Sequence, residues 1–150
     1  MGTYRRILLA VDLTDDSVQI AERAKAVAQT HGAELDVLHV VEPLPLLAPL
    51  DTPEIFAPTI QQTQDEITTG ARQRLEKLAA EVGLPARDTR VIVGNTQVEI
   101  LRAARERNVD LIVLGSRERH GLSLLVDFTE DAVLHKAPCD VLAVRVKVAG

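Results

Sequence analysis

Strand-length apolar runs alternate with helix-like patterns along the whole of this 150-residue chain. Five such runs are separated by four stretches in which apolar residues recur every three or four positions. An uninterrupted apolar run is typical of a strand buried on both faces of a parallel sheet. The alternation therefore predicts an open parallel five-stranded α/β sheet, flavodoxin-like or Rossmann-like, with helices on both faces. Residues 1–150 are expected to form one domain.

The bounds of these elements follow from apolar periodicity and from the residues that begin and end helices. The expected strands are 6–11, 35–41, 88–93, 111–114 and 140–146. The expected helices are 17–32, 60–82, one beginning at Thr96 and one between 127 and 138. Thr96-x-x-Glu99 and Asp127-x-x-Glu130 are capping-box patterns for the last two helices.

Side chains can also be assigned to the expected core and surface. Apolar positions at helical spacing are predicted to face the core. In the second, third and fourth helices these are Ile60, Ile67, Ala71, Leu75, Leu78, Val82, Val98, Leu101, Ala103, Ala104, Ala132, Val133 and Leu134. The charged residues of the third helix are most simply a solvated face, and they are Arg102, Arg105, Glu106 and Arg107.

Five prolines between Glu42 and Pro58 interrupt the periodic patterns. Proline removes a backbone donor and breaks regular structure, so this segment is predicted to be a long loop. A surface connection is the simpler interpretation. A lid over the carboxyl end of the sheet is the functional one, since long loops in compact domains often bind ligands.

Composition excludes several classes of function. A net charge of -5 with 2% aromatic residues and no Trp argues against nucleic-acid binding. No run approaches the ~20 apolar residues of a membrane span, so no membrane association is expected. Cys139 is the only cysteine, and the amino terminus lacks a long apolar segment, so we expect a cytoplasmic protein without a disulfide. Cys139 itself is predicted to be structural.

Motifs for catalysis and metal binding are missing from the sequence. There is no G-x-S-x-G, H-E-x-x-H, C-x-x-C or intact Walker A pattern. The four histidines are scattered, so no metal site is predicted. His39 lies inside an expected strand and is predicted to be a packed or hydrogen-bonded core residue. An enzyme is therefore not expected.

Ligands in open α/β sheets bind outside the carboxyl ends of the strands. Asp12 follows the first strand, and a charged loop, 116–121, follows the fourth. The two would meet if the first and fourth strands are neighbours at a topological switch point. A binding cleft and a solvated charged loop remain alternative interpretations of this arrangement.

Short motifs in a fixed order resemble the universal stress protein family over nearly the whole chain. They are Ile7–Asp12, His39–Val41, Gly94, Asp110–Gly115 and Ala137–Val144. The resemblance implies the strand order 3-2-1-4-5 and a homodimer paired through the last strand. Such pairing would also cover an apolar edge strand that otherwise exposes its backbone. The interface residues would be Val141, Leu142, Ala143, Val144, Arg145 and Val146.

The family divides into members that bind ATP and UspA-like members that do not. Binders carry a G-x2-G-x8 or x9-G-[ST] pattern whose glycines bring backbone amides to the ribose and phosphates. Gly115 matches the first glycine, but Glu118 replaces the second and Asp127-Phe128 replaces the Gly-Ser pair. The resemblance would place the following residues around a nucleotide: Ala10, Asp12, Val41, Gly115, Arg117, Arg119, Gly121 and Thr129.

The resemblance favours a UspA-like dimer in the stress response that acts through unidentified protein partners or phosphorylation, without a cofactor. A member that binds ATP or AMP through a divergent loop is the alternative, and an unrecognised enzyme is a third. Carboxylates at Glu118 and at a helix-capping Asp127 would oppose a phosphate there. We therefore expect ATP to bind more weakly than about 100 μM.

Overall fold

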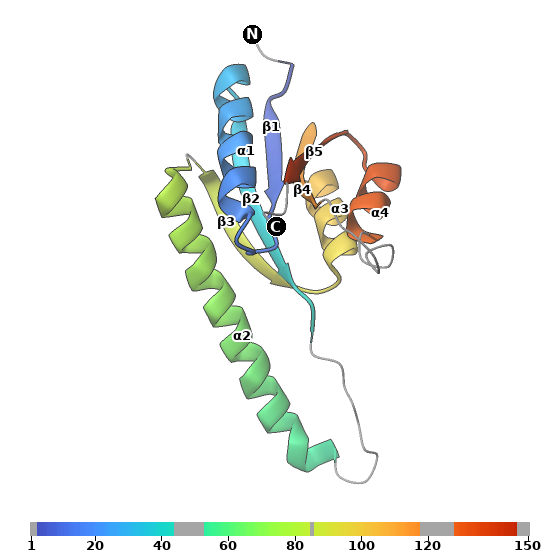
Figure 1. Ribbon diagram of the computed structural model, residues 1–150. Coiled ribbons are helices and arrows are strands. Elements are labelled where there is room, and N and C mark those ends of the chain that lie inside the picture. The colour runs from blue at the N-terminus through green and yellow to red at the C-terminus, as the bar shows by residue number, and fades with distance from the viewer. Residues whose placement is uncertain (1–2, 44–52, 85, 118–127, 147–150) are drawn as a thin grey trace.

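The computed structural model describes residues 3–43, 53–84, 86–117 and 128–146. The described chain alternates strands and helices from its first element to its last (Figure 1). In chain order the elements are β1 (Arg6–Ala10), α1 (Ser17–His31), β2 (Glu34–Val41), α2 (Pro53–Val82), β3 (Ala86–Val93), α3 (Thr96–Glu106), β4 (Leu111–Arg117), α4 (Phe128–Lys136) and β5 (Asp140–Val146).

All five strands run parallel in one sheet of order β3-β2-β1-β4-β5. The predicted fold class and strand order are therefore confirmed. β1 lies between β2 and β4, so the chain changes direction across the sheet at this strand. The carboxyl ends of β1 and β4 form the switch point at which such sheets bind ligands.

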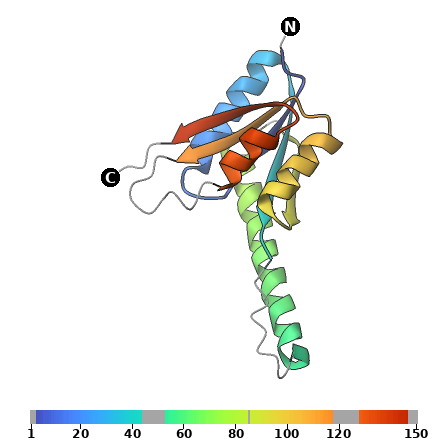
Figure 2. The ribbon, with the colours of Figure 1, turned by 90° about the vertical axis from the view of Figure 1, so that its right-hand side faces the viewer.

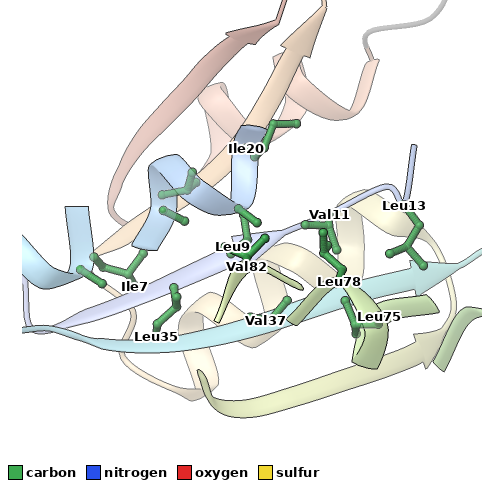
Figure 3. Packing of buried hydrophobic residues seen from close by; sticks show 14 of the residues in the cluster. Ile7, Leu9, Val11, Leu13, Ile20, Leu35, Val37, Leu75, Leu78 and Val82 are labelled. Carbon is green, nitrogen blue, oxygen red and sulfur yellow. The ribbon is translucent and has the colours of Figure 1, made fainter. Parts of the chain in front are cut away.

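Helices cover both faces of the sheet, and each face has its own apolar cluster (Figures 1 and 2). Successive side chains of a strand point to opposite faces. Ile7 and Leu9 of β1 therefore join Ile20 of α1 and Leu75 of α2, as Figure 3 shows. Leu8 packs on the other face with residues of α3 and α4. This two-sided burial explains the uninterrupted apolar runs.

Two predicted boundaries near the carboxyl end of the sheet were wrong. β4 continues through Gly115 to Arg117 because β5 pairs with it up to Val146, so the charged loop begins later than expected. α2 begins at Pro53, where a proline fits the first helical position because it needs no hydrogen-bond partner for a backbone N–H. The predicted loop 42–58 therefore ends before Pro53. Its residues 44–52 lie outside the described residues, and so does the lid that was predicted for them.

The start of α3 corrects a further set of predictions. Asn95, not Thr96, is the N-cap, and its side chain accepts a hydrogen bond from the Val98 amide at 3.0 Å. In this helix Val98 faces outward at 46% exposure, whereas Glu99 is buried at 8%. Leu134 of α4 is likewise 46% exposed, although its neighbour Val133 is buried.

The apolar stripe of α2 is covered along only part of its length. Ala71, Leu75, Leu78 and Val82 are buried as predicted. Ile67 is 41% exposed, and Ile60 is only half-buried. The physical reason is visible in Figure 1: the amino-terminal part of α2 extends past the end of the sheet.

Candidate functional site

The turn after β1 is built by hydrogen bonds to its backbone. The Val11 amide donates to the Leu38 carbonyl at 3.0 Å. His39 Nδ1 lies 2.7 Å from the Val11 carbonyl oxygen, and because a carbonyl can only accept, Nδ1 carries the proton. The predicted hydrogen bond of His39 is confirmed, although the residue is half-buried rather than part of the core.

Asp12 uses its carboxylate to close the connection to α1. Its Oδ1 accepts from the Thr14 amide at 3.3 Å, from Thr14 Oγ1 at 2.9 Å and from Ser17 Oγ at 3.4 Å. Ser17 is buried, whereas Asp12 is exposed at the carboxyl end of the sheet. The nominal N-cap, Asp16, makes no side-chain cap hydrogen bond. Asp12 therefore performs the ordering that an N-cap side chain usually supplies.

Leu13 adopts a left-handed backbone conformation with φ 56, which is uncommon for a residue other than glycine. Two interactions hold it there: its side chain is buried, and its carbonyl accepts a hydrogen bond from the Arg74 guanidinium of α2. Such a conformation costs on the order of 1 kcal/mol and persists where the surroundings determine it. No residue type in the sequence signals this strained position beside Asp12.

Val41, the last residue of β2, also has its backbone carbonyl hydrogen-bonded within the chain. Its side chain is buried, and its carbonyl accepts a hydrogen bond from the Gly94 amide at 2.9 Å. Gly94 is required here because an added Cβ would lie 2.9 Å from Glu99 Cγ. The buried Glu99 carboxylate in turn accepts hydrogen bonds from Arg102.

Gly115 has a packing role that the sequence pattern did not reveal. It lies within β4 opposite Val144, where a Cβ would come within 2.3 Å of Ile20 Cδ1 on α1. Glycine therefore allows the close approach of α1 to the sheet, and a larger residue would require the Ile20 side chain to shift. The match to a nucleotide-binding glycine has a structural explanation in this chain.

The structure brings only some of the predicted site residues together. Ala10, Asp12, Val41 and Gly115 lie at or near the carboxyl ends of three adjacent strands, β2, β1 and β4. Arg117 is the last residue of β4. Phe128 begins α4, with Thr129 in its first turn. Glu118, Arg119, Gly121 and Asp127 lie outside the described residues.

At the opposite end of the sheet, charged side chains form a connected network. Arg107, at the end of α3, contacts Asp36 at 3.2 Å and Asp88 at 2.5 Å, and its carbonyl accepts from Arg6 at 2.7 Å. Although partial burial opposes the charged form, hydrogen bonds to Asp36 and Asp88 raise the pKa of Arg107. The predicted solvated face of α3 was therefore wrong for Arg107.

An open cleft lies at this amino end, away from the candidate site. It encloses about 840 Å³, and its lining includes Tyr4, Arg6, His31 and Asp110. Tyr4 donates a hydrogen bond to Asp140 at 2.9 Å, which raises the pKa of its hydroxyl. Asp110 accepts from the amides of Arg5 and Arg6. The carboxylates of Asp110 and Asp140 near this cleft therefore already accept hydrogen bonds from groups of the chain itself.

Cys139 is partly buried just before β5. Burial and the nearby carboxylates of Asp110 and Asp140 raise the pKa of its thiol, outweighing a backbone hydrogen bond at Ile112 that lowers it. A raised pKa reduces the thiolate fraction and with it the reactivity of the sulfur. This environment agrees with the predicted structural role.

Among the residues that the structure describes, no group of three or more His, Cys, Asp or Glu side chains is placed to hold a metal ion. No helix there is long and apolar enough to span a bilayer.

Comparisons with known proteins relate this arrangement to one family. Residues 3–145 match the model of the universal stress protein family. Universal stress protein A homolog 1 of Coxiella burnetii is 35% identical over 144 residues, which are 96% of this chain and 98% of that protein.

Two solved structures show the same fold. Universal stress protein UspA from Lactobacillus plantarum has a TM-score of 0.74 and 27% identity, with 97% of this chain and 100% of that chain covered. The universal stress protein from Archaeoglobus fulgidus in complex with dAMP has a TM-score of 0.65 and 20% identity, covering 94% of this chain and 98% of that chain.

Proposed function

The chain belongs to the universal stress protein family, and we propose that it acts in the stress response as a homodimer that binds no nucleotide stably. One observation carries the second part of this proposal. The Asp12 carboxylate and the Val41 carbonyl both accept hydrogen bonds from the chain itself. The family resemblance implies that, in members that bind nucleotides, the residues at these two positions face adenine.

Donors of the chain already occupy Asp12 Oδ1 and one lone pair of the Val41 carbonyl oxygen, so an adenine would meet fewer open acceptors there, namely Asp12 Oδ2 and the remaining lone pairs. Thr14 and Ser17 both donate to Asp12 Oδ1, and Ser17 is buried. Gly94 donates to Val41 within the connection that leads into α3. A ligand that shares satisfied acceptors gains less than one that meets open ones. The proposal predicts weak binding of the base for this reason.

The sequence of the segment expected to lie near the phosphates also supports weak nucleotide binding. Glu118 and Asp127 place carboxylates in the connection between β4 and α4, where binders carry glycines. Like charges oppose an incoming phosphate, and an acidic residue before a helix competes for its first amides. Gly115, the one matching glycine, is explained by its contact with Ile20.

A nucleotide-binding function is the alternative, favoured by the shared fold of the Archaeoglobus protein in complex with dAMP. Thermal unfolding with ATP or AMP and Mg²⁺ separates the two functions. At 1 mM ligand, a Kd of about 100 μM raises the free energy of unfolding by about 1.4 kcal/mol. We expect a smaller increase. A larger one with either nucleotide would favour the alternative.

The dimer is proposed to form through β5, which is an edge strand in the monomer. Val141, Leu142, Ala143 and Val144 are only half-buried there, so apolar side chains and a free backbone edge are both available. Ala143→Lys places a charge on this edge in each copy and is expected to shift the species seen by light scattering to monomer.

Val98→Lys is the matched control because it introduces the same charge at an exposed apolar position of α3, far from β5 in sequence. It should leave the dimer intact. A dimer that survives Ala143→Lys, or a wild-type monomer, would contradict the interface.

A further inference from the structure

The open cleft at the amino end of the sheet is separate from the candidate site at the carboxyl end. Its volume of about 840 Å³ is within the range of clefts that hold small molecules. Its walls come from the segment before β1, the end of α1, the start of β2 and the segment between α3 and β4. A ligand in this cleft would therefore use none of the groups around Asp12.

Four charged residues line the cleft, and three of them already have partners. Arg6 pairs with Glu34 at 3.3 Å and also donates to the Arg107 carbonyl at 2.7 Å. Both oxygens of Asp110 accept hydrogen bonds from backbone amides, those of Arg5 and Arg6. Arg5 is exposed, and its guanidinium has no partner among the residues that the structure describes. The unpaired charge of the cleft is therefore positive.

Two neutral side chains of the cleft also have hydrogens to donate. His31 Nδ1 accepts from the Thr3 amide at 3.1 Å, so in the neutral ring Nε2 carries the hydrogen. Asn108 is exposed and carries a carboxamide with two donor hydrogens. Within the described chain, neither His31 Nε2 nor this carboxamide has a partner. Together with Arg5 they offer open donors to a ligand.

The rest of the lining limits the shape and the charge of that ligand. The rings of Tyr4 and His31 pack edge to face with centroids 5.0 Å apart, and both residues are half-buried, so ring surface remains open to a flat apolar group. Partial negative charge at the ends of α1 and α3, with the carboxylates of Glu34 and Asp110, opposes a doubly charged anion. A planar carboxylate with a single charge therefore fits better than a phosphate, and a guanidinium can bind it through two parallel hydrogen bonds.

We propose that this cleft binds a small organic carboxylate, with the Arg5 guanidinium on the anionic group and with His31 and Asn108 as further donors. A few polar groups that converge beside an apolar wall are the usual means by which small-molecule sites orient their ligands. Asn108 supports the assignment, because it adopts a left-handed conformation with φ 53 just after α3. Glycine is the usual residue at such a position, so the turn itself does not require the carboxamide.

Titration of the full chain with benzoate, followed by the NMR shifts of the Gly32 and Asn108 amides, tests the proposal. Both amides belong to residues that line the cleft. Benzoate should give saturating shifts with a Kd of about 1–10 mM. Benzamide has the same shape without the charge and should bind at least about fivefold more weakly. Inorganic phosphate should also bind more weakly than benzoate.

Three variants separate recognition in the cleft from general attraction to positive charge. Arg5→Gln should weaken benzoate binding at least about fivefold. Asn108→Gly removes the carboxamide, retains the left-handed backbone and should weaken binding about two- to threefold. Arg23→Gln removes the same charge from an exposed position in the middle of α1 and should leave the Kd unchanged.

Several results would overturn the proposal. One is the absence of saturating shifts at up to about 50 mM benzoate. Others are equal binding of benzamide and benzoate, or equal weakening by Arg5→Gln and Arg23→Gln. Tighter binding of phosphate than of benzoate would overturn the choice of a carboxylate. None of these results bears on nucleotide binding, which is assigned to the other end of the sheet.

Discussion

The two ends of the sheet use polar side chains in different ways. At the amino end, charges pair with each other across elements: Arg107 joins Asp36 of β2 to Asp88 of β3, and Arg6 pairs with Glu34. At the carboxyl end, Asp12 and His39 hold the backbone of a turn, through the Thr14 amide and the Val11 carbonyl, and the charge pair of Glu99 with Arg102 lies within α3 rather than between elements.

The paired charges at the amino end mainly stabilise the fold, whereas the polar groups at the carboxyl end mainly set the conformation of the turn. A partly buried charge left without its partner costs several kcal/mol, so the amino end is sensitive to single substitutions. A lost turn contact costs about 1 kcal/mol, but it changes which groups the turn presents. We therefore expect loss of a paired charge at the amino end to cost more stability than loss of a turn contact at the carboxyl end.

The largest effect is expected from Arg107→Ala at the amino end. It leaves Asp36, whose side chain is 10% exposed, beside Asp88 without a shared cation. Because the Arg107 side chain is itself 27% exposed, we expect a loss of about 2–3 kcal/mol in urea unfolding, below the range for fully buried pairs. Arg105→Ala, at an exposed position of α3, should cost less than about 0.5 kcal/mol. Equal losses in the two variants would show that the contacts of Arg107 to Asp36 and Asp88 do not stabilise the fold.

Gly115→Ala should destabilise the carboxyl half of β4 by overpacking. The new Cβ would lie 2.3 Å from Ile20 Cδ1, and Ile20 is buried, so we expect a loss of about 1–3 kcal/mol. Ile20→Val removes the clashing methyl group. The double variant should therefore lose less stability than the sum of the losses in the two single variants. Full additivity would place the cause outside this contact.

Asp12→Ala should cost about 1 kcal/mol, because it removes the acceptor that closes the turn into α1. Asp16→Ala is the matched control, since Asp16 occupies the nominal N-cap without a side-chain cap hydrogen bond. Thermal unfolding of both variants makes the comparison. A larger loss for Asp16→Ala would show that Asp16, rather than Asp12, orders the start of α1.

The smallest expected effect concerns Cys139, which lies near Asp110 and Asp140 at the amino end. Its raised pKa leaves less thiolate at about pH 8 than an ordinary cysteine has. A thiol reagent should therefore react more slowly with the native protein than with the protein in urea, and the native rate should still rise with pH beyond pH 8. Equal rates in the two states would contradict a protected thiol.

Much of the fold could be predicted because buried parallel strands leave long apolar runs in the sequence. β5 was predicted with its observed bounds, and the hydrogen-bonded role of His39 was also predicted. Local alternatives were harder to separate. Asn95 and Thr96 are adjacent residues that can both cap a helix, and only the backbone conformation selects Asn95.

The candidate site was less predictable because its geometry depends on contacts between distant elements. Gly115 matches a phosphate-loop glycine in sequence, but the atom that requires glycine belongs to Ile20, on another element. The left-handed Leu13 is held by Arg74, which is 61 residues away. A charged run near the end of α3 gives no sign that Arg107 differs from its neighbours until β2 and β3 bring Asp36 and Asp88 beside it.

Calorimetric titration of the purified protein with ATP and Mg²⁺ tests the central claim, which is that this chain does not bind nucleotide stably. The wild type should show a Kd weaker than about 100 μM. A variant with Glu118→Gly, Asp127→Gly and Phe128→Ser, which restores the glycine pattern, should bind more tightly. Wild-type binding tighter than this limit, or nucleotide that co-purifies with the unmodified protein, would contradict the claim.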